Sequence, residues 1–315
     1  MKKGWETPVC NNCKSNDNIV VYDNLTYWEY PGKFRIVKCS ICNLHFTSPR
    51  PNLNEIVKYY GKNDYFGIEQ VKKEKPENTF KPVYELISKY KKKGKILDIG
   101  AGTGSFLSKY KDDGWEVEGV ELTPAAVKYA KKAYDIKLRN GDLFNFKLKT
   151  DSYDVITMNE VLEHMHNPLE TLIKINSLLN KNGFIVITVP NIAGFGRRIF
   201  GKDWFPWQPP RHLYHFSPST LSEILKKAGF KKIVIKYNDD LQNRYILFQS
   251  LRYGKSPKFQ KKETGGLTNP KALNKSTPSL KIQIAKIIGN IITSLVAFIE
   301  PLVGKGEVMV VIARK

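Results

Sequence analysis

The segment Lys95–Leu107, KILDIGAGTGSFL, constrains the fold more than any other part of the 315-residue chain. It begins with a short apolar run of β-strand character, places glycines at 100, 102 and 104, and continues from Ser105 with a helical pattern. A strand, a glycine-rich turn and the start of a helix form a binding device for a charged or polar group. A chain of this length has room for one large domain and a smaller one.

Predicted strands and helices alternate after residue 94. Apolar, β-like runs occur at 95–99, 116–120, 153–158, 184–189, 231–236 and 307–313, and helical patterns occur near 105–113, 124–133, 168–180 and 218–228. This alternation predicts an α/β fold with a parallel sheet that is covered by helices on both faces. Ligands of such sheets bind at the carboxyl ends of the strands, which is where the glycine turn lies.

All four cysteines lie near the start of the chain, as the pairs Cys10/Cys13 and Cys39/Cys42. Two C-x-x-C pairs that bracket β-like segments are typical of a zinc ribbon, in which four thiolates hold the ion and leave no open position for catalysis. Two disulfides or four thiols without a ligand are the alternatives, and disulfides are disfavoured because the N-terminus shows no export signal. Residues 1–50 are therefore predicted to form a structural zinc ribbon.

The net charge of the chain and the lengths of its apolar runs indicate which partners and which cellular location to expect. The formal net charge is +21, and most of the 51 basic residues are lysines spread along the chain. Specific nucleic-acid readers rely on arginine forks, so nucleic-acid binding is possible on charge but not favoured. An anionic membrane surface or substrate would also suit a basic protein. No apolar run reaches the roughly 20 residues of a membrane-spanning helix, and a cytoplasmic protein is expected.

Five motifs follow one another in order: LDIGAGTG, VELTP, GDLF, YDVITMNEVLEH and GFIVITVPN. Within the second, Glu121 lies about 20 residues beyond the glycine turn, where a carboxylate can accept hydrogen bonds from ribose hydroxyls. The glycine spacing differs from the G-x-G-x-x-G of NAD-binding enzymes, which are the alternative. The motifs resemble class I S-adenosylmethionine (SAM)-dependent methyltransferases over residues 94–240. The resemblance implies a Rossmann-like, seven-stranded sheet completed by an antiparallel strand at 305–315.

The resemblance also implies a SAM-binding set. It places the glycine turn against the methionine moiety, Glu121 on the ribose, Asp142 on the adenine side and Asn159 at the near edge. The complete expected set is Asp98, Gly100, Ala101, Gly102, Gly104, Glu121, Leu122, Asp142, Leu143 and Asn159.

Further motifs narrow the resemblance. The EVLEH motif, the strand ending in Pro190-Asn191 and the later Phe216-Ser-Pro218 resemble ubiquinone-pathway O-methyltransferases and relatives that methylate sugars or surface-polysaccharide precursors. Some sugar C-methyltransferases carry a similar cysteine-rich zinc domain, followed by a long C-terminal domain without a counterpart here. The predicted reaction is methyl transfer to an oxygen of a small-molecule or lipid- or sugar-linked acceptor. An RNA methyltransferase, a sugar C-methyltransferase-like enzyme and a non-catalytic scaffold are the alternatives.

Acidic residues and histidines follow two of the predicted strands. An acceptor hydroxyl needs a base or a metal to help remove its proton. His164 or His212 could be that base. Alternatively, Glu160, Glu163 and His164 could bind a divalent cation together with His212 or His215, since small-RNA end methyltransferases use a similar Glu-x-x-Glu-His pattern for Mg²⁺. Glu and His ligands suit Mg²⁺, Mn²⁺ or Zn²⁺ without deciding among them. In a third interpretation these residues only cap the next helix and cover the cofactor. The expected catalytic set is Glu163, His164, His212 and His215.

Three segments lie outside the predicted core. Residues 51–93 are expected to form a helical connector, with helices at 52–60 and 80–92. The aromatic stretch 194–210 is expected to form a lid over the acceptor, or else an apolar patch packed under the ribbon. Residues 241–304 are an insertion whose stretch 282–299 has apolar residues at helical spacing. This amphipathic helix is predicted to contact the inner face of a membrane, the core or a second subunit.

Overall fold

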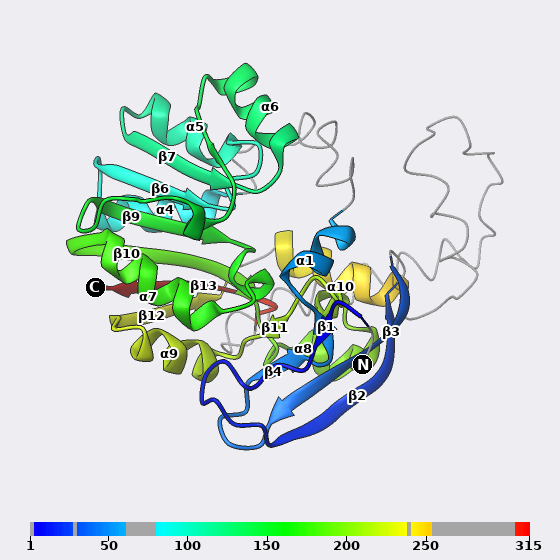
Figure 1. Ribbon diagram of the computed structural model, residues 1–315. Coiled ribbons are helices and arrows are strands. Elements are labelled where there is room, and N and C mark those ends of the chain that lie inside the picture. Colours follow the sequence, from blue (N-terminus) through cyan, green and yellow to red (C-terminus); the bar gives the residue numbers. More distant parts are fainter. Residues whose placement is uncertain (1–2, 28–29, 61–79, 238–240, 254–305) are drawn as a thin grey trace, which may run out of the picture.

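The computed structural model describes residues 3–27, 30–60, 80–237, 241–253 and 306–315 (Figure 1). A seven-stranded sheet has the order β12-β13-β10-β9-β6-β7-β8. Strand β13 pairs antiparallel with β10 and β12, and the other neighbouring strands are parallel. The predicted α/β sheet with an antiparallel last strand is confirmed. The strands are β6 (Lys95–Ile99), β7 (Glu116–Glu121), β8 (Arg139–Asn140), β9 (Tyr153–Asn159), β10 (Leu179–Pro190), β12 (Lys231–Tyr237) and β13 (Val308–Arg314).

Successive residues of the central strands point to opposite faces of this sheet, because side chains alternate along a strand. Val155 and Val186 pack with α4 and α5, whereas Ile156 and Ile187 pack with α7 and α9. Both faces are therefore buried, which explains the nearly continuous apolar character of the strands. The helices are α4 (Lys81–Tyr90), α5 (Ser105–Asp112), α6 (Pro124–Tyr134), α7 (Pro168–Leu178) and α9 (Pro218–Lys227).

The N-terminal part forms a second sheet with the order β11-β4-β3-β2. Its strands are β2 (Asn18–Tyr27), β3 (Tyr30–Cys39), β4 (His45–Thr47) and β11 (Tyr214–His215). Strand β11 is contributed by the part of the chain that follows β10, and a short β1 (Trp5–Glu6) pairs with β5 (Arg50–Pro51). Cys10, Leu44 and Phe46 belong to the same apolar cluster as the α7 side of the large sheet. The cysteine ribbon (residues 3–51) and the large sheet therefore share one core.

The described parts of the predicted connector contain helices near both expected positions, and these helices are shorter than expected. Helix α1 (Leu53–Ile56) begins after Asn52, whose side chain accepts hydrogen bonds from two backbone amides, and a 3₁₀ turn follows at Val57–Tyr59. Helix α10 (Leu241–Tyr253) begins the insertion. The predicted helix 282–299 lies outside the described residues. None of the helices in the described ranges has the length and apolarity that crossing a bilayer requires.

The aromatic segment after β10 contains α8 (Phe195–Phe200) and two 3₁₀ turns, Gly201–Asp203 and Phe205–Trp207. Trp204 and Trp207 are each 1% exposed and pack with Leu25 and Ile36 of the ribbon. The prediction of a lid is therefore wrong, and the apolar patch under the ribbon is the observed arrangement. The indole of Trp204 donates to the buried carboxylate of Glu307 at 2.6 Å, which fixes this segment against the start of β13.

Candidate functional site

The glycine turn lies at the carboxyl end of β6. Gly100, Gly102 and Gly104 all have left-handed backbone conformations, with φ of 73°, 52° and 77°, which favour glycine. A Cβ on Gly100 would lie 2.5 Å from a methyl group of Val161, and a Cβ on Gly102 would meet nothing within 4 Å. The middle of the turn therefore borders open space, while its first residue contacts the segment that carries the predicted catalytic residues.

Two buried carboxylates flank the turn. Glu121 is 2% exposed, and its two oxygens accept hydrogen bonds from the amides of Gly102 at 2.9 Å and Thr123 at 2.8 Å. Each oxygen retains a further lone pair for a ligand hydroxyl. Asp98 accepts a hydrogen bond from the Thr157 hydroxyl at 2.6 Å. Burial, helped by the charge of Glu121, raises the pKa of Asp98 to about 7.

The next strand ends present apolar side chains. Leu122 follows β7 and is 64% exposed, and Phe144, two residues after the predicted Asp142, is 46% exposed. Asp142 accepts a hydrogen bond from the Phe144 amide at 2.8 Å and caps the 3₁₀ turn Leu143–Asn145. Exposed apolar surface beside a carboxylate suits a nucleoside, whose base is apolar on its faces and polar at its edge.

Two other members of the expected SAM set line the sheet. The buried Ala101 follows Gly100, and its amide donates to the Val120 carbonyl at 3.1 Å. Asn159 ends β9 and accepts a hydrogen bond from the Thr188 hydroxyl at 3.3 Å. Its side-chain amide nitrogen is buried and has no acceptor within the described part of the chain. A buried donor without a partner is costly, so a ligand that accepts from it would be stabilised.

A second group of polar side chains brings together residues almost 50 positions apart: Glu163, His164 and His212. One ligand atom from each lies within 4.8 Å of the others, and Glu163 and His212 are 1% and 4% exposed. The Leu213 amide donates to the Glu163 carbonyl at 2.8 Å, which ties the two segments together. The structure therefore brings three residues of the expected catalytic set together, and their catalytic role stays a prediction. We refer to these three residues as the Glu–His cluster.

Hydrogen bonds to backbone carbonyls define the imidazole tautomers of the cluster. Nδ1 of His164 lies 3.0 Å from the Arg211 carbonyl, and Nδ1 of His212 lies 2.7 Å from the Pro206 carbonyl. A carbonyl can only accept, so both Nδ1 atoms carry the proton and both Nε2 atoms keep a lone pair. Burial lowers the pKa of His164 to about 4 and that of His212 well below its ordinary value. Both rings are therefore neutral at pH 7.

Glu163 of the cluster and the neighbouring Glu160 have no basic partner among the described residues. Both oxygens of Glu163 are buried, and neither has a hydrogen-bond partner of normal geometry in the part of the chain that the structure describes. Burial raises the pKa of Glu160 to about 7, and burial and the Glu160 charge raise that of Glu163 well above its ordinary value. Glu160 also has a left-handed φ of 54°, a strained conformation that is frequent at functional sites.

This donor set fits a divalent cation. Two neutral imidazole nitrogens and one carboxylate are the ligands of many catalytic metal sites, and backbone partners on Nδ1 orient the rings in the usual way. Two nitrogen ligands suit Mn²⁺ or Zn²⁺ better than Mg²⁺, which prefers oxygen and retained water. The ligands suit a divalent cation in general and do not select one metal.

The remaining histidines lie outside the cluster. His215 is in β11, and its ring packs against that of Trp207 with centroids 4.7 Å apart. Nε2 of His166 contacts the Pro51 carbonyl at 3.0 Å. Sequence patterns missed Tyr60, whose hydroxyl lies 3.3 Å from Nδ1 of His164. No local signal marks this contact, because Tyr60 comes from the connector, far from His164 in the chain.

The four cysteines converge as predicted. Sγ of Cys10 lies 3.4 Å from that of Cys42, Sγ of Cys13 lies 3.4 Å from that of Cys39, and all four lie within 4.8 Å of one another. Four thiolates around a zinc ion at about 2.3 Å are about 3.8 Å apart, so the observed arrangement fits such a site. Burial raises the pKa of Cys10, which a bound cation would reverse.

Comparison with known proteins assigns the family. A family model described as a methyltransferase domain matches residues 71–234, which is more than half of the chain. The chain belongs to this methyltransferase family. Its members are methyl-transferring enzymes, so the predicted enzyme class and the family resemblance are confirmed.

Several curated relatives share this region. A ubiquinone biosynthesis O-methyltransferase of Nitrosospira multiformis is 25% identical over 178 residues, which cover 49% of this chain and 73% of that protein. One of Cereibacter sphaeroides is 27% identical over 150 residues, covering 44% and 61% of the two chains. The methyltransferase thus spans only about three fifths of the Cereibacter relative.

Solved structures agree on the fold. A SAM-dependent methyltransferase from Archaeoglobus fulgidus superposes with a TM-score of 0.52 at 20% identity, and the match covers 80% of this chain and all of that one. At this identity the likeness concerns the fold alone. It agrees with the seven-stranded sheet and its antiparallel last strand.

Proposed function

We propose that this methyltransferase transfers the methyl group of SAM to a hydroxyl oxygen of a small-molecule or lipid- or sugar-linked acceptor. The observation that carries the proposal is the position of the Glu–His cluster. Val161, two residues before Glu163, packs against Gly100 of the glycine turn. Groups suited to an acceptor therefore adjoin groups suited to the methyl donor. The names of the ubiquinone-pathway relatives support oxygen as the attacked atom.

The donor half of the site would hold SAM through residues at the ends of β6, β7 and β8. Glu121 would accept hydrogen bonds from the ribose hydroxyls, and Asp142 with Leu122 would receive the adenine. The turn from Gly100 to Gly104 would admit the methionine moiety beside Asp98, because the middle glycine faces open space. The sulfonium of SAM supplies an electrophilic methyl group. What this chain must add is alignment of the acceptor oxygen with that methyl.

The acceptor half would use the Glu–His cluster. Glu163 would supply the anionic ligand, and His164 and His212 would supply their Nε2 lone pairs to a divalent cation. Such a cation lowers the pKa of a bound hydroxyl and fixes its position. The backbone carbonyls of Arg211 and Pro206 keep both rings in the ligating tautomer. General-base action by His164 or His212 is the competing interpretation, and metal dependence of turnover separates the two.

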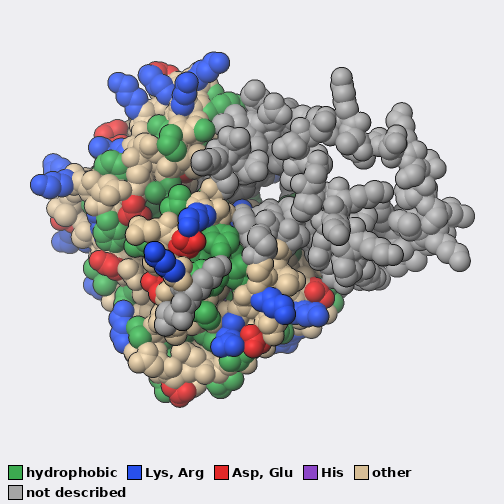
Figure 2. Space-filling view, turned by 45° about the vertical axis from the view of Figure 1, so that its right-hand side comes forward, with side chains coloured by type: hydrophobic (Ala, Val, Ile, Leu, Met, Phe, Trp, Pro, Cys, Tyr) green, Lys and Arg blue, Asp and Glu red, His purple; other side chains and the backbone are tan. Residues whose placement is uncertain are grey.

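Three further features are proposed from the sequence and the architecture. Cys10, Cys13, Cys39 and Cys42 would bind a structural zinc ion. The amphipathic helix that the sequence predicts at 282–299 would bring the enzyme to a membrane surface, where a lipid-linked acceptor would lie, in an otherwise cytoplasmic protein. On the face in Figure 2, basic side chains are interspersed with acidic and apolar ones and do not form one continuous patch. This pattern fits the preference for a small acceptor over nucleic acid.

Substitution of Glu121 is expected to weaken SAM binding by about 10- to 100-fold, because hydrogen bonds to a charged group contribute about 1.5–3 kcal/mol. The Glu121 carboxylate accepts hydrogen bonds from two backbone amides. In Glu121→Gln, one of these amides faces the side-chain nitrogen and loses its acceptor. Calorimetric titration with SAM and with its demethylated product measures the effect. Glu118→Gln is the matched control, since Glu118 lies on the same strand and pairs with Lys95 and Arg139. Wild-type affinity in Glu121→Gln would contradict the ribose assignment.

Asp98 is expected to make the stability of the ligand-free protein depend on pH. Its pKa rises from 3.8 to about 7 on folding, so the folded state favours the protonated acid and loses stability as the pH rises through that range. Relative to Asp98→Asn, the wild type should lose about 3 kcal/mol of unfolding free energy between pH 5 and pH 8. Urea unfolding of both proteins at the two pH values measures this. A pH-independent difference would show that Asp98 is ionised throughout.

A further inference from the structure

The cysteine ribbon reaches the Glu–His cluster through a row of hydrogen bonds that begins at Thr47. Thr47 ends β4 and is fully buried. Its hydroxyl donates to the His212 carbonyl at 2.9 Å, and its amide donates to the Leu213 carbonyl at 2.9 Å. The Leu213 amide in turn donates to the Glu163 carbonyl at 2.8 Å. Three bonds therefore connect a ribbon residue to both segments that carry the cluster.

The strand pairing continues this connection. Tyr214 and His215, which follow Leu213, pair with Phe46 and His45 of β4. The segment that carries His212 is thus an extension of the ribbon sheet, and its position is set by the ribbon strand beside it. The EVLEH segment is linked to that extension through Glu163.

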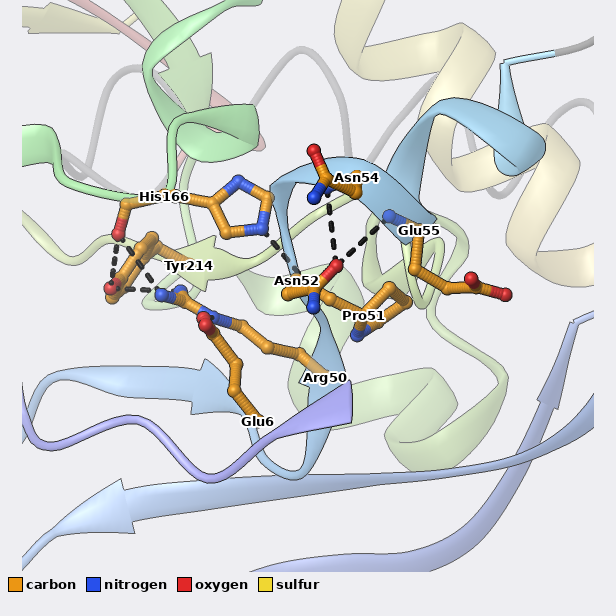
Figure 3. Close-up of polar contacts among 8 residues, drawn as sticks. All are labelled: Glu6, Arg50, Pro51, Asn52, Asn54, Glu55, His166 and Tyr214. Atoms are coloured by element: carbon orange, nitrogen blue, oxygen red, sulfur yellow. Dashed lines mark hydrogen bonds and ion pairs between the residues drawn. The ribbon is translucent and has the colours of Figure 1, made fainter. Parts of the chain in front are cut away.

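A second anchor lies beyond the cluster. Figure 3 shows the Arg50 guanidinium between Glu6, Tyr214 and His166. Arg50 is 4% exposed, and it donates to the Glu6 carboxylate at 2.7 Å, the Tyr214 hydroxyl at 3.0 Å and the His166 carbonyl at 3.1 Å. A buried charge with all these partners resists displacement, because breaking the set would leave the charge uncompensated. The ribbon thus holds both segments at a second point, two residues beyond His164 and His212 along the chain.

The cysteine knuckle itself contacts the acceptor side of the fold. The side chain of Asn11, which lies between Cys10 and Cys13, accepts a hydrogen bond from the Leu169 amide at 2.9 Å. By contrast, none of the hydrogen bonds between described residues joins the ribbon to the glycine turn, to Glu121 or to Asp142. The contacts of the ribbon are therefore directed to the acceptor half and not to the donor half.

We propose that Thr47 is a positioning residue through which the cysteine ribbon holds the Glu–His cluster in its ligating arrangement. This inference rests on the proposed function, because it assumes that the cluster binds a cation. The ribbon then has a role in acceptor chemistry without contributing a catalytic residue. Thr47 touches neither ring of the cluster in this scheme and acts through the backbone of residues 212 and 213.

Two substitutions of Thr47 distinguish the effect of its hydroxyl group from the effect of its side-chain volume. Thr47→Val keeps the volume and leaves the His212 carbonyl without its donor, whereas Thr47→Ser keeps the hydroxyl and loses a methyl group. Thr47→Val is expected to weaken Mn²⁺ binding to the zinc-loaded protein about tenfold, in the range found for groups that orient metal ligands. Thr47→Ser should restore most of the affinity. Titration followed by the electron paramagnetic resonance of free Mn²⁺ measures both, and SAM affinity should be unchanged.

The matched control is Thr171→Val, which removes an equally buried hydroxyl that also donates to a backbone carbonyl, that of Asn167. It should lower thermal stability without changing Mn²⁺ affinity. Wild-type Mn²⁺ affinity in Thr47→Val, or equal losses in Thr47→Val and Thr47→Ser, would overturn the positioning role. If the wild type binds no Mn²⁺, the metal assignment fails separately. In that case, the amide hydrogen-exchange rates of residues 161–166 and 211–215 test the positioning role. Exchange should be faster in Thr47→Val than in the wild type and in Thr47→Ser. Unchanged exchange in Thr47→Val would overturn the inference.

Discussion

Glu163→Ala and His212→Ala are each expected to reduce kcat by on the order of a thousandfold while leaving SAM affinity nearly unchanged. A cation that polarises the acceptor hydroxyl contributes several kcal/mol to the transition state, and about 4 kcal/mol corresponds to that factor. Loss of one of the three ligands of the Glu–His cluster should remove most of this contribution. SAM affinity should persist because neither residue belongs to the donor half. Turnover with a quinol or sugar acceptor, with calorimetry of SAM binding on the same samples, measures both quantities.

The control for this prediction is His215→Asn. His215 is as buried as His212 but packs against Trp207 outside the cluster, so its substitution should leave kcat close to the wild-type value. Added Mn²⁺ should raise turnover in the wild type and not in Glu163→Ala. If SAM affinity collapses together with turnover, Glu163 and His212 are cofactor-binding residues and the division into donor and acceptor halves is wrong. Full activity in the presence of a chelator would favour the general-base interpretation.

The large sheet could be predicted because each of its long strands and helices has a recognisable pattern within its own sequence segment. Strands buried on both faces are nearly continuous apolar runs, and the helices between them carry a clear periodicity. Strand β8 escaped notice because Arg139 and Asn140 are both exposed and polar, so they give no apolar signal. Strand β11 is equally short and is defined by its pairing with β4, which no pattern around residue 214 reveals.

The Glu–His cluster was partly predictable for the same reason. Glu163 and His212 follow neighbouring strands of a parallel sheet, and the carboxyl ends of such strands meet at one edge. The inclusion of His215 was a prediction that the geometry does not favour. It lies three residues after His212, and on an extended chain residues an odd number apart point to opposite sides. The contacts of Thr47 and Tyr60 were unpredictable, because each joins residues more than 100 positions apart.

The conformation of the aromatic segment 194–210 is determined by a residue that is distant in the sequence. Its tryptophans and glycines resemble a mobile lid in sequence. The carboxylate of Glu307, contributed by the strand region more than 100 residues later, accepts hydrogen bonds from the Gly196 amide and the Trp204 indole, both at 2.6 Å. A Cβ on Gly196 would lie 2.6 Å from that carboxylate, so glycine is required there for close packing and not for mobility.

Cys39→Ser is expected to abolish zinc binding and to lower the thermal midpoint by about 5–10 °C, which corresponds to roughly 5 kcal/mol for a chain of this size. Structural zinc sites contribute free energies comparable to the whole stability of a domain. Cys39 is fully buried and shares the apolar cluster of the large sheet, so the loss should reach beyond the ribbon. Because the ribbon contacts the acceptor half, Mn²⁺ affinity should fall as well, and SAM affinity should change little. Metal analysis and calorimetry on the same samples measure these effects.

Ser40→Ala is the matched control, since Ser40 lies in the same knuckle and carries no ligand atom of the four-cysteine group. It should retain a single zinc ion per chain and the wild-type midpoint. Thiol titration of the unfolded wild-type protein separates the alternatives for the cysteines: four reactive thiols after chelation indicate a metal site, and none indicates two disulfides. A zinc-free wild type with four thiols and an unchanged midpoint in Cys39→Ser would show that the ribbon is stable through the apolar core alone. The connection from Thr47 to the Glu–His cluster would then act without any contribution from a metal in the ribbon.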